Sequence, residues 1–386
     1  MLPKTADVVI IGSGAMGLST AYHLALNGYS NIVVLERDSY PGGHSTSRCA
    51  GGFRHQFATE INILLSKLSN EMFLRYRDEM DCKAVLNSCG YMFVLTGNDN
   101  VEAFKSAMTI QHRLGIETQW ITVEDIREKI PRVSLEDVVA ATYYQMDGLI
   151  DVGNVMNAHI SAVNRLGIKL LVDTSVLDIG VRNGRIDHVI TSKGNISTPI
   201  VVNAAGARSA QICRMMQIDL PVKPVQQQLF VTSELPWVSE DFPVVIFPAE
   251  GIGFHKEGKG LLSGLHKPEV ENESLNLSVD TDWEMVHCEK LIERIPSIED
   301  SKIISSWAGF YEMTPDLHPI IGRMPWIEGL FCITGFSGHG FMHSPACGLL
   351  VSEEIIYGKA KTLDITSLRI ERFHNAGEKT TEFYKI

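Results

Sequence analysis

The first 36 residues contain an apolar strand, a glycine-rich turn, a helix and a second apolar strand, in that order. Residues 8–11 are all apolar, which is typical of a strand buried on both faces of a parallel sheet. Gly12, Gly14 and Gly17 follow, and the apolar residues after them recur at helical spacing until Gly28. Residues 32–35 are again apolar and end at Glu36. The sequence therefore predicts a complete β-α-β unit at the amino terminus.

This unit has the features of a dinucleotide site. The three glycines allow a tight turn, close approach of a pyrophosphate, and close packing of the helix on the strand. The N–H groups at the helix N-terminus then face the phosphates. Glu36 stands at the end of the second strand, where its carboxylate can accept hydrogen bonds from an adenosine ribose. A purely structural glycine turn is the alternative, but the strands, helix and acid all fall where a dinucleotide needs them.

The rest of the chain alternates between two textures. Helices are predicted at residues 60–80, 101–114, 152–166 and 344–357, and strands at residues 91–95, 138–144, 169–172, 200–202 and 330–334. Turn signals at residues 182–184 and 192–194 separate short strands. Residues 221–266 are rich in short strands and turns, which indicates an antiparallel sheet.

Composition and charge limit the class of partner and the compartment. With 386 residues the chain is long enough for two or three domains. Its net charge of -12 disfavours a nucleic-acid backbone as partner. Seven cysteines without a CxxC pair fit reduced cytoplasmic thiols better than disulfides or a metal site. We expect neither an export signal nor a transmembrane segment, and a location in the cytoplasm or at the periphery of membrane electron transport.

Five sequence blocks resemble one family of flavoproteins. They are residues 12–17, 45–54, 201–207, 314–322 and 335–341, in this order. Together they resemble the FAD-dependent amino-acid and amine oxidoreductases of the D-amino-acid oxidase superfamily (DAO family). The likeness is greatest to sarcosine oxidase β subunits and dye-linked L-proline dehydrogenase β subunits, and it covers nearly the whole chain. The resemblance implies FAD rather than NAD as the cofactor.

The resemblance also implies a fold in which two domains interleave. The fold class is α/β, or α+β overall: a Rossmann-type FAD-binding domain with an antiparallel-sheet substrate domain inserted in it. Residues 1–82, 150–222 and 306–386 would form the FAD-binding domain, and residues 83–149 and 223–305 the substrate-binding domain. Because the glycines implied to contact FAD lie near both ends of the chain, we expect that neither half folds or binds flavin alone.

The residues implied to contact FAD come from all five blocks and from the segments near them. They are Gly12, Gly14, Ala15, Met16, Gly17, Glu36, Arg37, Ser45, Arg48, Gly51, Val176, Ala204, Ala205, Gly206, Gly309, Gly335, Gly338, His339, Gly340, Phe341 and Met342. The N–H groups and helix dipole that follow the last glycines can stabilise negative charge on the reduced flavin ring.

Three residues match positions that act on substrate in sarcosine oxidases. Arg54 matches the arginine that holds the substrate carboxylate, and a surface arginine or a phosphate contact is the alternative. Tyr311 can orient the amine or carboxylate, with core packing as the alternative. His266 can accept a proton from an amine, with a satisfied structural histidine as the alternative. We interpret His339 as shaping its loop, and the sequence assigns no role to His55.

Three departures from the family pattern carry information. Gly309 and Arg48 stand where relatives attach the flavin through cysteine or histidine, so noncovalent FAD is predicted. Leu262 replaces a lysine that activates oxygen in monomeric sarcosine oxidases, which favours a dehydrogenase with another electron acceptor. Met342 replaces a second carboxylate-binding lysine, so we expect Met342 and Leu262 to make the substrate pocket more apolar.

The sequence thus predicts an FAD-dependent enzyme, of EC 1.5 type, that oxidises the C–N bond of a secondary or α-amino acid such as proline or sarcosine to an imine. Its partners are a small amino-acid substrate and an electron acceptor that the sequence does not identify. The alternatives are an oxygen-using amino-acid oxidase of sarcosine, glycine or D-amino-acid type, and an FAD-binding subunit that is active only in a hetero-oligomer. A third alternative for the function is an NAD-dependent Rossmann dehydrogenase. A homo-oligomer is the alternative to an assembly with partner subunits.

Overall fold

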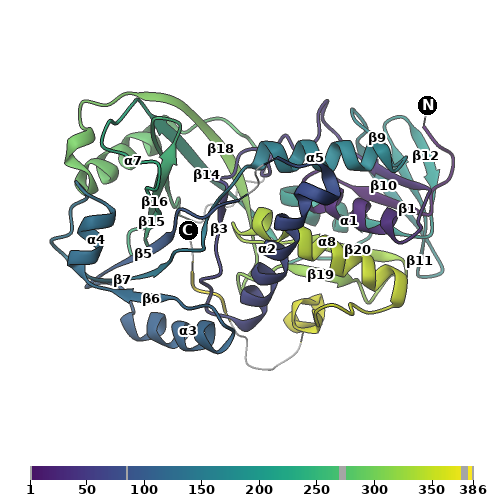
Figure 1. Ribbon diagram of the computed structural model, residues 1–386. Coiled ribbons are helices and arrows are strands. Elements are labelled where there is room, and N and C mark those ends of the chain that lie inside the picture. The colour runs from purple at the N-terminus through teal and green to yellow at the C-terminus, as the bar shows by residue number, and fades with distance from the viewer. Residues whose placement is uncertain (1, 84–85, 269–274, 375–380, 385–386) are drawn as a thin grey trace.

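The computed structural model describes residues 2–83, 86–268, 275–374 and 381–384. Two large sheets occupy opposite sides of the molecule, and long helices lie between and around them (Figure 1). Strands of the first sheet come from residues 8–35, 169–203 and 320–334, and strands of the second come from residues 91–144 and 223–313. Each sheet is therefore assembled from segments far apart in the sequence.

The first sheet has six strands in the order β19-β20-β13-β1-β2-β9. Their bounds are β1 (Val8–Ile11), β2 (Ile32–Leu35), β9 (Lys169–Leu171), β13 (Val201–Asn203), β19 (Ile320–Arg323) and β20 (Leu330–Thr334). Neighbouring strands are parallel except β19 and β20. All four residues of β1 and of β2 are buried, which confirms the prediction of strands covered on both faces.

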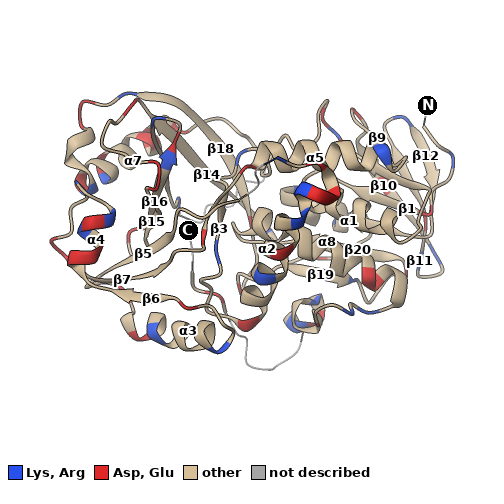
Figure 2. Ribbon diagram, viewed as in Figure 1, with Lys and Arg blue, Asp and Glu red and all other residues tan. Residues whose placement is uncertain are grey.

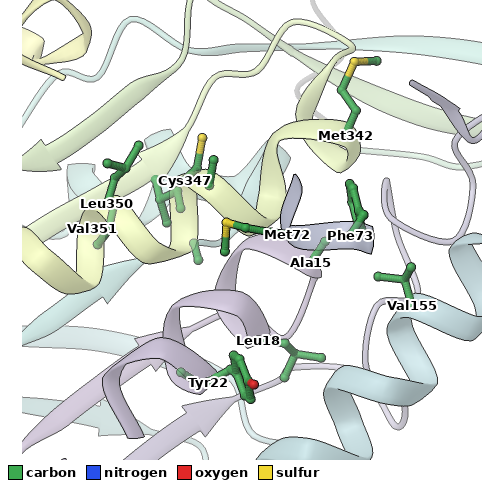
Figure 3. Packing of buried hydrophobic residues seen from close by; sticks show 14 of the residues in the cluster. Ala15, Leu18, Tyr22, Met72, Phe73, Val155, Met342, Cys347, Leu350 and Val351 are labelled. Atoms are coloured by element: carbon green, nitrogen blue, oxygen red, sulfur yellow. The ribbon is translucent and has the colours of Figure 1, made fainter. Parts of the chain in front are cut away.

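Four helices pack against one another beside this sheet: α1 (Ala15–Leu26), α2 (Glu60–Met80), α5 (Val152–Arg165) and α8 (Gly340–Tyr357). Figure 3 shows Leu18 and Tyr22 of α1 with Met72 of α2 and Leu350 of α8 in their shared core. Gly348 lets α8 approach α1 closely, because a Cβ there would collide with Ser19. The amino-terminal and carboxyl-terminal helices are thus packed as one layer.

Helix α8 begins at Gly340, so the predicted start at Ser344 was wrong. A start at Ser344 would have placed Pro345 in the first turn, where proline is favoured. In the structure Pro345 lies inside the helix, where it cannot donate to the carbonyl of Phe341. The hydroxyl of Ser344 donates to that carbonyl instead, at 2.8 Å. The extra turn brings the helix N-terminus to the loop at Gly338.

The second sheet has eight strands in the order β18-β14-β17-β16-β15-β5-β7-β6. Their bounds are β5 (Tyr91–Thr96), β6 (Gln119–Ile121), β7 (Val138–Tyr144), β14 (Lys223–Thr232), β15 (Val244–Phe247), β16 (Ile252–Glu257), β17 (Gly260–Leu265) and β18 (Ile303–Met313). Only β15 and β5 run parallel, so the predicted antiparallel character of residues 221–266 is confirmed.

Smaller elements complete the fold. They are the helices α3 (Val101–Arg113), α4 (Val123–Lys129), α6 (Ser209–Arg214) and α7 (Thr281–Arg294), a sheet of β10 (Val176–Arg182), β11 (Arg185–Thr191) and β12 (Gly194–Ser197), and a sheet of β3 (Gly52–Phe53), β8 (Gly148–Ile150) and β4 (Leu86–Asn87). Asn183 and Gly184 form the predicted turn between β10 and β11, both with positive φ.

Charges of both signs alternate along outer helices such as α3 and α4 (Figure 2). All seven cysteines are free thiols. Within the residues that the structure describes, no helix has the length and apolar character needed to cross a membrane.

Candidate active site

A cavity of about 420 Å³ lies where the two large sheets meet. Its lining combines the loop after β1, the N-terminal ends of α1 and α8, the loop at residues 42–52, and one face of the eight-stranded sheet. The residues implied to contact FAD and those implied to contact substrate therefore border one continuous space.

The glycine turn after β1 fits a phosphate-binding loop. Gly12 has a φ of +105°, and a Cβ there would collide with the carbonyl oxygen of Ala204. A Cβ at Gly17 would collide with the carbonyl oxygen of Gly12, so Gly17 allows the close packing of α1 on β1. Gly14, the N-cap residue of α1, has no side chain with which to cap the helix, and the first turn contains no acidic residue. The N–H groups of this turn therefore point at the cavity with room for an anion.

Glu36 is held firmly at the end of β2, where it lines the cavity. Its carboxylate accepts hydrogen bonds from the backbone N–H of Ser13 at 3.1 Å and from the Ser13 hydroxyl at 2.6 Å. The other carboxylate oxygen accepts the N–H of Asp38 at 3.0 Å. A carboxylate has about four acceptor positions, so capacity is left for ribose hydroxyls.

Hydrogen bonds from the loop at residues 42–52 link the first turn of α1 to the eight-stranded sheet. The hydroxyl of Thr46 accepts the N–H of Ala15 at 3.2 Å, in the first turn of α1. Ser45 donates to the carbonyl of Phe310 at 2.8 Å, and Arg48 donates to the carbonyl of Ala308 at 3.1 Å. Both carbonyls belong to β18, so this loop fixes the edge of the substrate wall relative to the glycine turn.

A second helix N-terminus, that of α8, reaches the same cavity. His339 is its N-cap residue and makes no side-chain cap, while Gly338, Gly340 and Phe341 line the cavity. Gly338 has a φ of +101°, and a Cβ there would lie 2.8 Å from the ring of Tyr311. The loop thus presents backbone N–H groups and a positive helix end directly beside Tyr311.

The eight-stranded sheet forms a mostly apolar wall with a few polar groups. Leu262 on β17 is 5% exposed, and Met342 at the start of α8 is 7% exposed. Tyr311 on β18 and His266 just after β17 also line the cavity. Burial raises the pKa of Tyr311 to about 12, so its hydroxyl keeps its proton and can donate a hydrogen bond.

Most of the predicted site residues border this cavity. Those that do are Gly12, Gly14, Ala15, Met16, Glu36, Arg37, Ser45, Arg48, Gly51, Val176, Ala204, Ala205, Gly206, Leu262, His266, Gly309, Tyr311, Gly338, Gly340, Phe341 and Met342. Gly17, Arg54, Gly335 and His339 lie outside its lining. Gly335 has a φ of +78° and packs against Thr314, so its place is in the support of the loop.

Arg54 lies behind Met342 and is 2% exposed. A second void, of about 10 Å³, is bordered by Arg54 and by Met342, which also borders the main cavity. The guanidinium lies over the ring of Phe57 at 3.8 Å and donates to the carbonyls of Gln56 and Tyr384, the latter at 2.9 Å. Burial lowers the pKa of Arg54. Among the described residues no carboxylate forms an ion pair with it, and the charges of Glu382 and Asp147 only partly offset the effect of burial on its pKa.

A cluster of buried histidines surrounds Arg54. The rings of His339 and His343 lie 5.1 Å apart, and both lie 5.3 Å from Phe57. Burial lowers the pKa of His343 to about 3 and that of His339 well below its usual value, so both are neutral. Nδ1 of His55 forms a hydrogen bond of 2.7 Å with a carboxylate oxygen of Asp147, and His55 lies outside the cavity lining.

Four residues of the site or its support were missed in the sequence. Tyr91 lines the cavity from β5, and Thr46 holds the first turn of α1. Glu312 accepts the N–H of Gly335 and the hydroxyl of Thr334, both at 3.0 Å. Glu382 supports α2 from the far end of the chain. Thr46 and Glu312 adjoin residues that the sequence did single out, but neither pattern nor spacing indicates the contacts of Tyr91 or Glu382.

The residues present fit a bound FAD. The N-termini of α1 and α8 point at one cavity, and neither N-cap residue makes a side-chain cap. The turn before α1 has no room for a Cβ on Gly12. Glu36 stands at the end of the cavity suited to a ribose, and Tyr311 and Leu262 stand on the sheet wall. This is the arrangement needed for a pyrophosphate at α1 and a ring system at α8.

The sequence model of the family described as "FAD dependent oxidoreductase" (DAO) matches residues 7–354. The chain belongs to this family. A member of known structure, L-proline dehydrogenase from P. horikoshii, superposes with a TM-score of 0.89 and 31% identity, over 97% of this chain and 99% of that chain. Glycine oxidase from Geobacillus kaustophilus shares the fold, with a TM-score of 0.84 and 22% identity over 97% and 100% of the two chains.

Curated members of the DAO family match over almost the whole chain. "FAD-dependent oxidoreductase domain-containing protein 1" from Xenopus laevis is 30% identical over 96% of this chain and 83% of its own length. Mitochondrial sarcosine dehydrogenase from Mus musculus is 27% identical over 97% of this chain, which spans only 42% of that relative. The chain is therefore an FAD-dependent oxidoreductase, and the family favours FAD over NAD.

Proposed function

We propose that this protein oxidises the C–N bond of a secondary or α-amino acid, proline-like or sarcosine-like, to an imine, with noncovalently bound FAD. The observation that carries the proposal is the cavity in which the N-termini of α1 and α8 face a largely apolar sheet wall. The 31% identity with L-proline dehydrogenase over nearly the whole of both chains supports the substrate class. When bound, FAD would accept a hydride from the carbon next to the substrate nitrogen.

The side chains of this protein would bind and orient the substrate. Tyr311 keeps its proton and can donate to a carboxylate oxygen or accept from an amine. His266, on the same wall, can accept the proton that an amine must lose before it gives up a hydride. The apolar wall around Leu262 excludes water, which strengthens each of these polar contacts.

We further propose that Arg54 holds the substrate carboxylate. Its buried charge has carbonyl partners but no carboxylate among the described residues, so an incoming anion would gain a charge-assisted pair. The carboxylate would have to displace the Tyr384 carbonyl or draw the guanidinium past Met342. Met342 is unbranched and has three rotatable bonds, so its side chain can change rotamer at low cost.

We propose an electron acceptor other than oxygen. Leu262 places an apolar group on the wall, where a cation would be needed to stabilise charge developing on oxygen. The alternative of an oxidase, and that of a subunit active only with partner chains, predict different results in the tests below.

Noncovalent attachment is proposed because Gly309 and Arg48 have no nucleophile to offer at their positions. Cys49 is the cysteine that lines the cavity among the described residues. Its thiol donates to the carbonyl of Thr46 at 3.1 Å, and burial raises its pKa to about 11. A protonated thiol in this setting is a poor nucleophile.

The first experiment tests the cofactor and the reaction together. The purified protein should be yellow, and acid precipitation should release all flavin into the supernatant as FAD. Anaerobic addition of proline, sarcosine or glycine should then bleach the flavin, and an artificial dye should restore its colour faster than oxygen does. Flavin retained in the pellet would contradict noncovalent attachment, and rapid peroxide formation would favour the oxidase alternative.

The second experiment tests Arg54. Arg54→Lys keeps the charge but loses the fork of donors, so we expect KM for the amino acid to rise by about tenfold or more while FAD content is unchanged. Arg294 is a matched control, because it is also buried but pairs with Asp137 and Glu250, and none of these three residues lines the cavity. Equal kinetic effects of Arg54→Lys and Arg294→Lys would contradict the assignment.

The two-domain division remains a proposal, which the six-stranded sheet supports. All six of its strands come from residues 1–82, 150–222 and 306–386. The boundary proposed at residue 306 does not coincide with the end of an element, because strand β18 pairs with β14 of the eight-stranded sheet from Ile303 to Met313.

If the alternative of an obligate subunit is correct, the purified chain will hold FAD but no amino acid will bleach it.

A further inference from the structure

Tyr91 is a buried tyrosine whose hydroxyl reaches the main cavity. It begins β5, is 2% exposed, and lines the cavity together with Val244, its register partner on β15. No residue that the structure describes forms a hydrogen bond with the Tyr91 hydroxyl. A buried hydroxyl costs free energy unless it finds a partner, so this group is available to a bound molecule.

The position of Tyr91 is fixed by the same residues that hold Arg54. Gln56 donates through Nε2 to the carbonyl of Tyr91 at 2.9 Å, and the carbonyl of Gln56 accepts from Arg54. The ring of Tyr91 lies 5.3 Å from that of Phe93, over which the Arg54 guanidinium lies at 5.4 Å. Tyr91, which lines the cavity, is therefore linked to the buried cation through Gln56 and Phe93.

Tyr311 lines the same cavity from β18, although four strands separate β5 from β18 in the sheet. Burial raises the pKa of Tyr91, so its hydroxyl keeps its proton. A hydroxyl that keeps its proton over the whole working pH range is a permanent hydrogen-bond donor.

We propose that Tyr91 is a second substrate-binding tyrosine, whose hydroxyl donates a hydrogen bond to the substrate carboxylate on the side of the cavity nearest Arg54. The inference rests on the proposed function, and it adds a donor that the sequence did not indicate. Tyr311 would then be left for the opposite side of the substrate. The Tyr91 hydroxyl and the Arg54 guanidinium can together hold a carboxylate in a single orientation, which places the carbon next to nitrogen in a constant position.

Tyr144 provides a matched control. It pairs with Tyr91 in the register of β5 and β7, so both tyrosines occupy adjacent points of the same sheet. Tyr144 lies against His55, at 5.7 Å between ring centroids, and does not line the cavity. Replacing either tyrosine by phenylalanine removes one hydroxyl and keeps the ring.

The test measures binding of pyrrole-2-carboxylate to the holoenzyme through the change in the flavin absorbance spectrum. Pyrrole-2-carboxylate is a flat ring carboxylate with no oxidisable C–H next to nitrogen. We expect Tyr91→Phe to weaken binding about tenfold, the loss of one hydrogen bond to a charged group. We expect Tyr144→Phe to change it less than twofold, and both variants to retain FAD. In Tyr91→Phe, KM for proline should rise together with the Kd for pyrrole-2-carboxylate. Pyrrolidine lacks the carboxylate, so it should bleach the flavin of the wild type and of Tyr91→Phe equally.

The outcomes separate the two proposals. If proline bleaches the wild-type flavin but Tyr91→Phe binds pyrrole-2-carboxylate and proline as the wild type does, the role of Tyr91 is wrong and the proposed function stands. Equal weakening in Tyr91→Phe and Tyr144→Phe overturns the role of Tyr91 as well, because it indicates a general disturbance of the strands. If no amino acid bleaches the wild-type flavin, the proposed function fails, and the inference fails with it.

Discussion

Replacing Gly12 by alanine should damage both the fold and FAD binding, and Gly28 provides the comparison that isolates the cause. Both glycines have positive φ, +105° for Gly12 and +93° for Gly28. Alanine pays roughly 1–2 kcal/mol for a backbone of this kind, less about 0.4–1 kcal/mol because it loses less freedom on folding. Nothing lies within 4 Å of a Cβ at Gly28, so Gly28→Ala should lower the free energy of unfolding by about 1 kcal/mol.

Gly12→Ala adds a collision to this backbone cost. Its Cβ would meet the carbonyl oxygen of Ala204, with the carbonyl carbon at 2.9 Å and Cα of Ala205 at 3.2 Å. These are backbone atoms of the segment after β13, so they cannot move aside without shifting the strand. Overpacking of this kind costs about 1–3 kcal/mol, which brings the expected loss for Gly12→Ala to about 2–4 kcal/mol.

The assay is thermal and urea unfolding of both variants as apoproteins, together with FAD titration followed by quenching of flavin fluorescence. A shift of the turn moves the N–H groups of α1 away from the pyrophosphate, so FAD should bind at least tenfold more weakly to Gly12→Ala and unchanged to Gly28→Ala. If the two variants unfold alike and bind FAD alike, the close contact between the glycine turn and residues 204–205 determines neither the stability of the fold nor the affinity for FAD.

Three further predictions concern the substrate wall, the carboxyl-terminal segment and pH. Leu262→Lys should raise peroxide formation relative to dye reduction at least tenfold, because a cation would now stabilise charge on oxygen; Leu262→Met is the control, and an unchanged ratio would contradict the argument on the acceptor. Glu382→Gln should lower the free energy of unfolding by about 1–3 kcal/mol, since the carboxylate accepts the N–H groups of Ala58 and Thr59 before α2; Glu102→Gln on the surface should have no effect in the same unfolding assay. Burial lowers the pKa of four histidines to about 3 or 4, namely His23, His159, His287 and His343. The unfolded state binds more protons than the folded state below pH 6.5, so stability should fall with decreasing pH from there, by about 1.4 kcal/mol per pH unit for each histidine; His287→Gln should reduce the measured slope by about one proton.

The sequence predicted the elements whose pattern is local. Strands β1 and β2 and helix α2 were found with their bounds, because continuous apolar runs and an amphipathic repeat report burial directly. The start of α8 was missed because Pro345 looks like a first-turn residue, and only the hydroxyl of Ser344 in three dimensions makes it acceptable further in. Rules based on residue type assume that a proline inside a helix leaves a backbone carbonyl without a donor. They fail where a neighbouring side chain supplies that donor.

The candidate site was predictable as far as its glycines. Gly12 and Gly338 mark places where the backbone must take positive φ, and such places are readable from residue type. The surroundings of Arg54 were not readable, because its partners include the carbonyl of Tyr384, which is 330 residues away in sequence. Tyr91 was missed for the same reason: its importance comes from the packing of β5 beside Arg54 and from no motif of its own.

The packing of α8 on α1 has a consequence for synthesis of the protein. Strand β1 needs β13 as its neighbour, and α1 needs α8, yet more than 300 residues separate α1 from α8 in the chain. At roughly 5–20 residues per second, the ribosome exposes α1 for about 15–60 s before its partner helix is made. During that interval the apolar face of α1 has no cover from α8, so the nascent chain should bind chaperones that recognise apolar helices. The cavity proposed for FAD has its full lining only once α8 has been made, because the first residues of α8 border it.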